Sequence, residues 1–255
     1  MAASKHILVL GATGRQSEHD PFPGLDSTQL AMANLPRLGA SGLEFIKAVL
    51  GDPSKHVTLL TRSVSKLPQE YLSHGQISVV QGQLNDPVAV GKAMEGVTSV
   101  VSFLGAYITL ANFLTRSTDT PIADSLQTVF AAMRAAGVKR LMALSTPGGF
   151  QQPGERPSWL WWLLVHVIPK LVTPGGVAEM RRIGEVVSAQ KDLDWTVFRI
   201  PHLNEGSKDL EVRTGFIGAG YDGSWELSRA SLVRWVLREL DEGKWTGRAP
   251  AVGNA

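Results

Sequence analysis

Cysteine is absent from the 255 residues, so neither a disulfide nor thiolate chemistry can contribute to this protein. The absence is compatible with a reducing compartment. Neither sign of charge is in clear excess: the formal net charge is only +2, and the sequence contains no basic block. We therefore expect a small-molecule partner and no nucleic acid.

The sequence also lacks a leader-like N-terminus and a long hydrophobic run. Residues 1–6 lead directly into a short apolar run, without a cleavable leader, so we expect a cytosolic protein. No run reaches the roughly 20 apolar residues that span a bilayer. Because 44% of the residues are hydrophobic and no repeat or low-complexity linker is visible, we expect one domain over residues 1–255.

An interrupted glycine-rich turn follows the first predicted strand, residues 6–10. Gly11, Thr13 and Gly14 begin a phosphate-binding turn, but the third glycine is displaced to Gly42, where an amphipathic helix starts. Joined, the two pieces read Gly-Ala-Thr-Gly-Ala-Ser-Gly. We interpret residues 15–39 as a 25-residue insertion in a dinucleotide-binding turn, whose backbone N–H groups and helix dipole would hold a phosphate.

Predicted strands and helices alternate after this turn. The strands cover residues 56–61, 77–81, 97–104, 139–145 and 195–200. The helices cover residues 41–50, 86–96, 120–136, 177–190 and 228–240. This order predicts an α/β fold, a doubly wound parallel Rossmann sheet with its ligand across the carboxyl ends of the strands. Residues 146–255 should supply the substrate side.

The end of the second strand carries basic residues where an NAD enzyme would place an acid. Arg62 follows the strand and Lys66 stands four residues later. A guanidinium and an ammonium suit a 2′-phosphate, so the cofactor is predicted to be NADP(H) in preference to NAD. The alternative is that both side chains only solvate a loop.

An apolar segment rich in tryptophan covers residues 157–169. Three interpretations stay open: a core or subunit-contact helix through which the chain could form an oligomer, a lid over the substrate, or a helix that docks on a membrane surface.

Several short motifs resemble the atypical short-chain dehydrogenase/reductases, in particular the NmrA-like group and the biliverdin-IXβ (flavin) reductases. They comprise the split Gly11/Gly14/Gly42 turn and residues 61–68, 103–105, 144–146, 201–202 and 227–229. The resemblance implies that Arg62 and Lys66 bind the 2′-phosphate and that Leu104 and Gly105 lie against the adenosine half of the cofactor.

The same resemblance implies that four residues flank the nicotinamide: Ser145, Thr146, Pro201 and His202. Two positions depart from the family pattern. Gln83 replaces an acid that often follows the third strand, and Val186 stands where many NmrA-like reductases have a lysine.

The Tyr-x-x-x-Lys pair of typical short-chain dehydrogenases is missing. Tyr71, Tyr107 and Tyr221 are followed four residues later by Gly75, Ala111 and Trp225. A hydride transfer would therefore take its proton from solvent, from Thr146 or from His202, the one nearby group that titrates close to neutral pH. Structural roles for these side chains remain an alternative.

These observations predict an NADPH-dependent reductase of a planar apolar acceptor such as a flavin, quinone or aromatic polyketide. We expect Tyr107, Phe150, Trp159 and Trp162 to line its substrate cleft. Two alternatives remain: a non-enzymatic NmrA-like sensor that binds the dinucleotide as a redox signal, and a non-redox isomerase or cyclase on the same fold.

Overall fold

The computed structural model describes residues 5–11, 39–105, 118–218 and 220–255. Three predicted site residues, Thr13, Gly14 and Tyr107, lie outside the described residues, as does the proposed insertion except Gly39.

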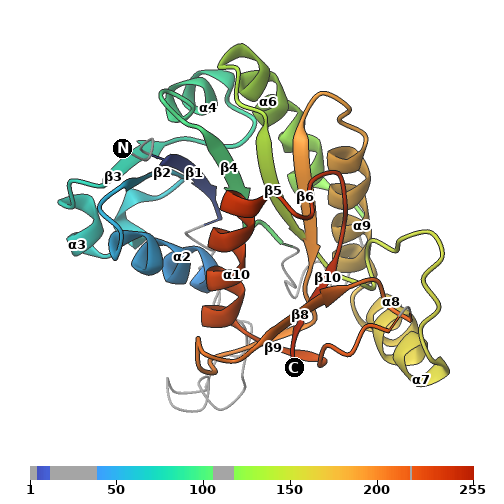
Figure 1. The fold of residues 1–255 in the computed structure, drawn as a ribbon. Coiled ribbons are helices and arrows are strands. Elements are labelled where there is room, and N and C mark those ends of the chain that lie inside the picture. Colours follow the sequence, from blue (N-terminus) through green and yellow to red (C-terminus); the bar gives the residue numbers. More distant parts are fainter. Residues whose placement is uncertain (1–4, 12–38, 106–117, 219) are drawn as a thin grey trace, which may run out of the picture.

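An eight-stranded sheet forms the centre of the molecule, in the order β3-β2-β1-β4-β5-β6-β10-β8 (Figure 1). Its strands are β1 (Lys5–Leu10), β2 (Lys55–Thr61), β3 (Ile77–Gln81), β4 (Ser99–Ser102), β5 (Arg140–Ser145), β6 (Asp194–Arg199), β8 (Val212–Gly215) and β10 (Ala251–Asn254). Every neighbouring pair is parallel except β10 and β8. The predicted doubly wound Rossmann sheet is thus confirmed, with an antiparallel strand added at one edge.

Helices cover both faces of this sheet. On one face α2 (Ala40–Leu50) packs against α10 (Arg229–Glu242). The other face is covered by three helices that lie side by side in chain order: α4 (Pro87–Ala93), α6 (Pro121–Ala135) and α9 (Pro174–Ser188) (Figure 1). The short elements η1 (Val64–Lys66) and α3 (Gln69–Leu72) follow β2.

Local capping explains where several helices begin. Asp86 caps α4 by accepting the N–H groups of Val88 and Ala89, and Pro87 occupies the first helical position. Ser228 caps α10 by accepting the N–H of Ser231.

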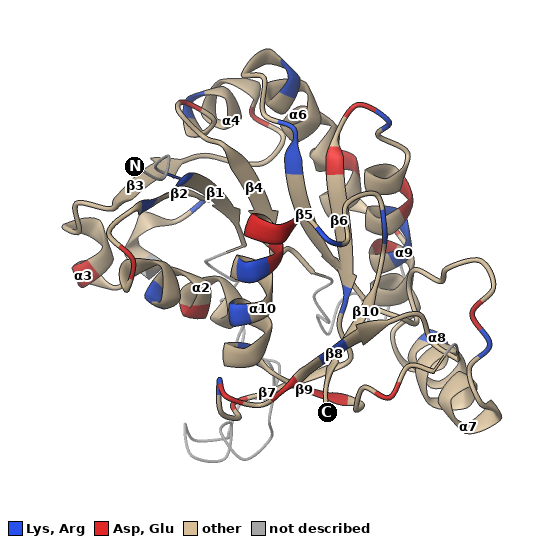
Figure 2. Ribbon diagram, in the orientation of Figure 1, with Lys and Arg blue, Asp and Glu red and all other residues tan. Residues whose placement is uncertain are grey.

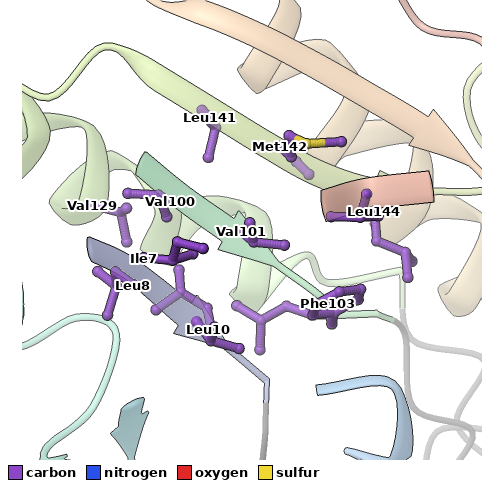
Figure 3. Close-up of a cluster of buried hydrophobic side chains, with 14 of the residues drawn as sticks. Ile7, Leu8, Leu10, Val100, Val101, Phe103, Val129, Leu141, Met142 and Leu144 are labelled. Carbon is purple, nitrogen blue, oxygen red and sulfur yellow. The ribbon is translucent and has the colours of Figure 1, made fainter. Parts of the chain in front are cut away.

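The core lies between the central strands and the two helix layers. Figure 3 shows side chains of β1, β4 and β5 packed together. Among them, Ile7, Val100 and Leu141 are at most 1% exposed. Strands buried on both faces read as continuous apolar runs, which is why the sequence identified them.

Four short strands and the tryptophan-rich segment differ from the prediction. The sequence did not predict β7 (His202–Asn204), β9 (Glu226–Ser228), β8 or β10, each of three or four residues. Strands β7 and β9 pair in a separate parallel sheet. The tryptophan-rich segment forms one helix in three parts: α7 (Trp159–Trp162), a π-helical turn η2 (Leu163–Val167) and α8 (Ile168–Val172).

Candidate functional site

The carboxyl ends of four neighbouring strands meet at one edge of the sheet. Phe103, after β4, donates its N–H to the carbonyl of Leu10, at the end of β1, over 2.9 Å. Ile200, after β6, donates its N–H to the carbonyl of Ser145, at the end of β5, over 3.0 Å. The residues directly after these strands are therefore neighbours, where a doubly wound sheet binds its ligand.

Gly11 opens the turn after β1 and has no room for a side chain. Its φ angle is +90°, in the region that favours glycine, and a Cβ there would stand 3.0 Å from both the Leu104 nitrogen and the Phe103 carbonyl carbon. The backbone of Gly11 thus lies directly on the segment after β4. The absence of a side chain at Gly11 fits a dinucleotide, because side chains must be absent where a pyrophosphate approaches the backbone.

Helix α2 begins after this turn with an open N-terminus. Its N-cap, Gly39, has φ 90° and ψ −6°, no side chain among the described residues caps it, and its first turn holds no acid. Gly42 is buried within that first turn. Among the described residues no side chain caps the first N–H groups of α2, which suits an anion such as a phosphate.

Arg62 follows β2 at the same edge of the sheet. Its side chain is exposed, and within the described part of the chain it forms no ion pair. Its carbonyl accepts the Gln81 Nε2 over 3.3 Å, which ties its backbone to the end of β3. Lys66 ends η1, four residues further on.

Segments 103–105 and 144–146 lie side by side. A Cβ on Gly105 would stand 3.5 Å from Leu144 Cδ2, and Leu104 is 8% exposed. Predicted cofactor residues from β1, β4 and β5 are therefore brought together.

The two hydroxyl side chains that close β5 differ in their surroundings. Ser145 is fully buried and donates its Oγ proton to the Met180 carbonyl of α9 over 2.8 Å. This bond is the structural role expected of a hydroxyl at a strand end, and it leaves Ser145 no exposed surface. Thr146 is partly exposed and its Oγ1 accepts the Gly149 N–H over 3.1 Å. Its hydroxyl proton is not used by that bond and can be donated to a ligand.

Pro201 and His202 follow β6 and start the small sheet. His202 is exposed, and its backbone N–H donates to the Trp225 carbonyl over 3.1 Å. The Trp225 ring contacts the Trp161 ring edge-on, with 5.5 Å between the ring centroids. Through its backbone, the predicted proton donor is therefore linked to a residue of an aromatic pair, in which Trp161 comes from the tryptophan-rich segment and Trp225 was not expected from the sequence.

Phe150 contributes to a cavity of about 350 Å³ between the turn after β5 and helices α8 and α9. Its ring lies on the backbone of α9 at Gly184, where a Cβ would overlap the ring. The cavity also exposes two cationic groups and one carboxylate, those of Lys170, Arg181 and Glu185. Its lining therefore combines charged groups with one aromatic ring.

A buried ion pair that the sequence did not reveal holds this turn in place. Arg199 is 0% exposed and donates from Nη1 and Nη2 to Glu155 over 2.7 and 2.6 Å. Arg199 also donates to the carbonyls of Phe150 and Ala249, over 3.1 and 2.8 Å. The pair thus joins the turn after β5 to β6 and to the chain just before β10.

The pKa of Glu155 shows which effect dominates at this pair. Burial alone would raise the pKa of the carboxyl, but the hydrogen bonds and charge of Arg199 and the N–H groups of Gln152 and Ile217 lower it overall. Glu155 is therefore held as a carboxylate.

Glu179, on α9, supplies a cap that the sequence also did not reveal. Its carboxylate accepts the N–H groups of Ala123 and Ile122 in the first turn of α6, over 2.9 and 3.3 Å. Burial raises its pKa, and the two N–H donors oppose that rise. Thr120, the N-cap residue, makes no side-chain capping bond. Val186, further along α9, is buried in the core.

The helix Trp159–Val172 lies on the surface, so its interpretation as a core helix is wrong. Trp159 is 76% exposed and Trp162 is 51% exposed. By length and composition no single helix among the described residues could cross a membrane, although this helix and α9 together, bent by 115°, meet the same criteria. Only one side of the helix, around Val165 and His166, is buried, and this side covers the turn after β5. The remaining side chains are therefore partly or largely exposed.

Comparison with known proteins agrees with this architecture. A family model described as NAD(P)H-binding matches residues 38–243. A short-chain dehydrogenase/reductase from Veillonella parvula, solved in complex with NADP, is 18% identical with a TM-score of 0.70, over 98% of this chain and 94% of that one. A Rossmann-fold NAD(P)-binding family protein from Shigella flexneri is also 18% identical, with a TM-score of 0.64 over 98% and 94% of the two chains. No curated protein matches the sequence significantly.

The family match covers most of the chain, and the similar structures share its fold end to end. The predicted NAD(P)-binding family is therefore confirmed, and the fold is the one that the short-chain dehydrogenase/reductase from Veillonella parvula adopts. This chain belongs to the NAD(P)H-binding family.

Proposed function

We propose that this protein is an NADPH-dependent reductase whose acceptor is a planar, apolar, conjugated molecule such as a flavin, a quinone or an aromatic polyketide. The observation that carries the cofactor choice is Arg62, an exposed guanidinium with no ion-pair partner among the described residues, at the end of β2. An acid at this place would favour the ribose hydroxyls of NAD, whereas a guanidinium favours a 2′-phosphate. The NADP complex of the Veillonella protein supports the same choice.

The chain's own groups would position the dinucleotide along the carboxyl edge of the sheet. Gly11 and the first turn of α2 would hold the pyrophosphate, with Thr13 and Gly14 completing the turn. Arg62 and Lys66 would hold the 2′-phosphate. NADPH supplies a hydride when it is bound.

Three further groups would complete the binding site. Leu104 and Gly105 would pack against the adenosine half, and Pro201 would help to enclose the nicotinamide. Their support is that the ends of β4, β5 and β6 are neighbours. Because the Ser145 hydroxyl donates its proton to the Met180 carbonyl, we propose that Ser145 acts only by fixing α9 against β5.

The proton at the acceptor would come from Thr146, from His202 or from solvent. Within the described part of the chain the Thr146 hydroxyl proton has no acceptor, and His202 is exposed. Phe150 and the tryptophan segment, including Trp159 and Trp162, would provide apolar surface for the acceptor, together with Tyr107. Among the described residues no ionisable side chain is bonded to the Thr146 hydroxyl or to the His202 ring, which fits a redox step on an acceptor that solvent can protonate.

Consumption of NADPH tests this proposal. Absorbance at the nicotinamide band should fall when the protein is mixed with NADPH and either riboflavin or menadione, and NADH should be used far less well. NADPH binding without turnover of any flavin or quinone would refute the reductase and leave the binding assignment intact.

A second function is favoured by the missing Tyr-x-x-x-Lys pair. NmrA-like regulators bind the dinucleotide as a redox signal, and such a sensor needs no proton donor. It would bind NADPH and NADP⁺ with different affinities, consume neither, and retain a protein partner in one redox state. Calorimetry with both cofactor forms, together with a pull-down under each, separates the sensor from the reductase.

A further inference from the structure

The helix Trp159–Val172 carries apolar side chains where most soluble proteins carry polar ones. Seven are between 42% and 76% exposed: Trp159, Leu160, Trp162, Leu164, Ile168, Leu171 and Val172. Folded monomers rarely expose contiguous apolar patches of more than a few hundred Å², and larger ones mark a surface that binds something. We refer to this segment as the exposed apolar helix.

The spacing of these side chains gives the helix two distinct sides. Leu160, Leu164 and Ile168 follow each other at four-residue intervals and form one outward stripe. The inward side holds Val165 and His166, which are 2% and 5% exposed. The helix is thus anchored to the protein along one side and offers hydrocarbon along the other.

Within its own sequence the exposed apolar helix carries charge of a single sign. Arg156 precedes it, Lys170 lies in its last turn, and the sequence from residue 156 to residue 178 contains no Asp or Glu. Within the ranges that the structure describes, neither cation forms an ion pair. Figure 2 shows the ribbon of α7 and α8 almost entirely without charged residues, at a corner of the molecule away from the main sheet.

We propose that the exposed apolar helix docks on the surface of a lipid bilayer that contains anionic headgroups. Tryptophan is the side chain best suited to the boundary between hydrocarbon and water, and three of them stand in the first turn. Cations at both ends complement anionic phospholipids. A protruding helix with an apolar stripe suits insertion into a soft surface, about 5–10 Å deep.

The length of the helix sets its orientation at the bilayer. Its three parts contain 4, 5 and 5 residues. At about 1.5 Å per residue the helix is roughly 21 Å long, less than the ~30 Å thickness of the hydrocarbon core. It therefore lies in the plane of the interface.

Docking in this way would bring the candidate site close to the membrane. Trp161, within the helix, contacts the Trp225 ring, and the Trp225 carbonyl accepts the N–H of His202. The exposed apolar helix is thus joined, through the Trp161–Trp225 ring contact, to the strand pair that carries His202. The docking itself requires no redox activity, so this proposal does not depend on the proposed reductase.

Sedimentation with vesicles tests the proposal. Wild-type protein should sediment with vesicles of phosphatidylcholine and phosphatidylserine. Leu160→Asp and Leu164→Asp should each bind the vesicles at least about tenfold more weakly, because a charge replaces a leucine that the bilayer would bury. Val88→Asp is the matched control: Val88 is 81% exposed in the first turn of α4, and its replacement should leave sedimentation unchanged.

The contribution of charge is measured by varying the lipid. Omitting phosphatidylserine should weaken binding of the wild-type protein to the vesicles. Lys170→Gln should weaken binding to vesicles that contain phosphatidylserine by about fivefold, which is the effect of one lysine near an anionic surface. Equal binding to both kinds of vesicle would overturn the choice of an anionic surface.

A second copy of the chain is the competing occupant. A wild-type dimer in analytical ultracentrifugation that Leu164→Asp converts to monomer, without vesicle binding by either form, would overturn the proposal and identify a subunit contact. If the aspartate variants do not fold, brominated phosphatidylcholine gives the answer on the wild-type protein. Its tryptophan fluorescence should be quenched, and unchanged fluorescence would overturn the proposal.

Discussion

Replacing Glu155 by glutamine should strongly destabilise the protein, because it removes the charge that balances the fully buried Arg199. The carboxylate accepts four hydrogen bonds of 2.6–2.9 Å, two from Arg199 and one each from the N–H groups of Gln152 and Ile217. A glutamine keeps one acceptor oxygen and directs an NH₂ group toward donors. Breaking a buried pair on one side costs about 3–5 kcal/mol, since an uncompensated charge remains.

This loss is measured by urea unfolding at neutral pH and by the melting temperature. For a chain of this size 3–5 kcal/mol corresponds to a decrease of roughly 6–20 °C in Tm. Glu242→Gln is the matched control: its pair with Arg238 is exposed, with 4.0 Å between charged atoms, and should contribute less than about 1 kcal/mol. A change below about 1 kcal/mol for Glu155→Gln would refute the argument.

The same pair predicts a dependence on pH. The pKa of Glu155 is lowered in the folded protein, so its contribution to stability is complete above the unfolded pKa of about 4.3 and is lost as the pH falls through the folded value. The free-energy difference between the wild-type protein and Glu155→Gln should therefore be constant from pH 5 to pH 7, as estimated from that reference pKa, and shrink in more acidic buffer.

Three further predictions concern the cofactor turn and the chemistry. Gly11→Ala should cost about 2 kcal/mol or more of unfolding free energy, from its positive φ and its 3.0 Å contacts, whereas Gly91→Ala, with open space around it in α4, should be neutral or stabilising; equal values would contradict the close packing. His202→Ala should lower kcat by less than about 100-fold, and a larger loss with NADPH affinity intact would show it to be an essential acid. Deleting Arg15–Gly39 should give a folded protein that binds NADPH in calorimetry at least as tightly, because Gly14 would then replace the left-handed N-cap glycine of α2; loss of folding or of binding would make the segment part of the site.

The parts of the fold that the sequence predicted are those with a local signal. Buried parallel strands form continuous apolar runs, and Asp86-Pro87 marks a helix start within two residues. The strands β7 to β10 have no such signal. Each has three or four residues, and β10 contains a glycine and an asparagine, so its pairing with β6 and β8 depends on contacts across the whole chain.

The residues of the candidate site also differ in whether the local sequence could identify them. Gly11 and Arg62 could be predicted as site residues because each directly follows a strand, at the edge of the sheet where a ligand would bind. The direction of the Ser145 hydroxyl depends on Met180, which is 35 residues away in the sequence. The partner of Arg199 lies 44 residues away, so no spacing rule could identify it.

Binding of NADPH and NADH to the wild-type protein and to Arg62→Ala tests the central claim most directly. If Arg62 holds the 2′-phosphate, isothermal titration should show that the variant binds NADPH about 1.5–3 kcal/mol more weakly, roughly 10–150-fold, while NADH binding is nearly unchanged. Arg238→Ala, an exposed arginine on α10, is the matched control and should leave both affinities as they are. An equal loss for both dinucleotides, or no loss for either, would contradict the account.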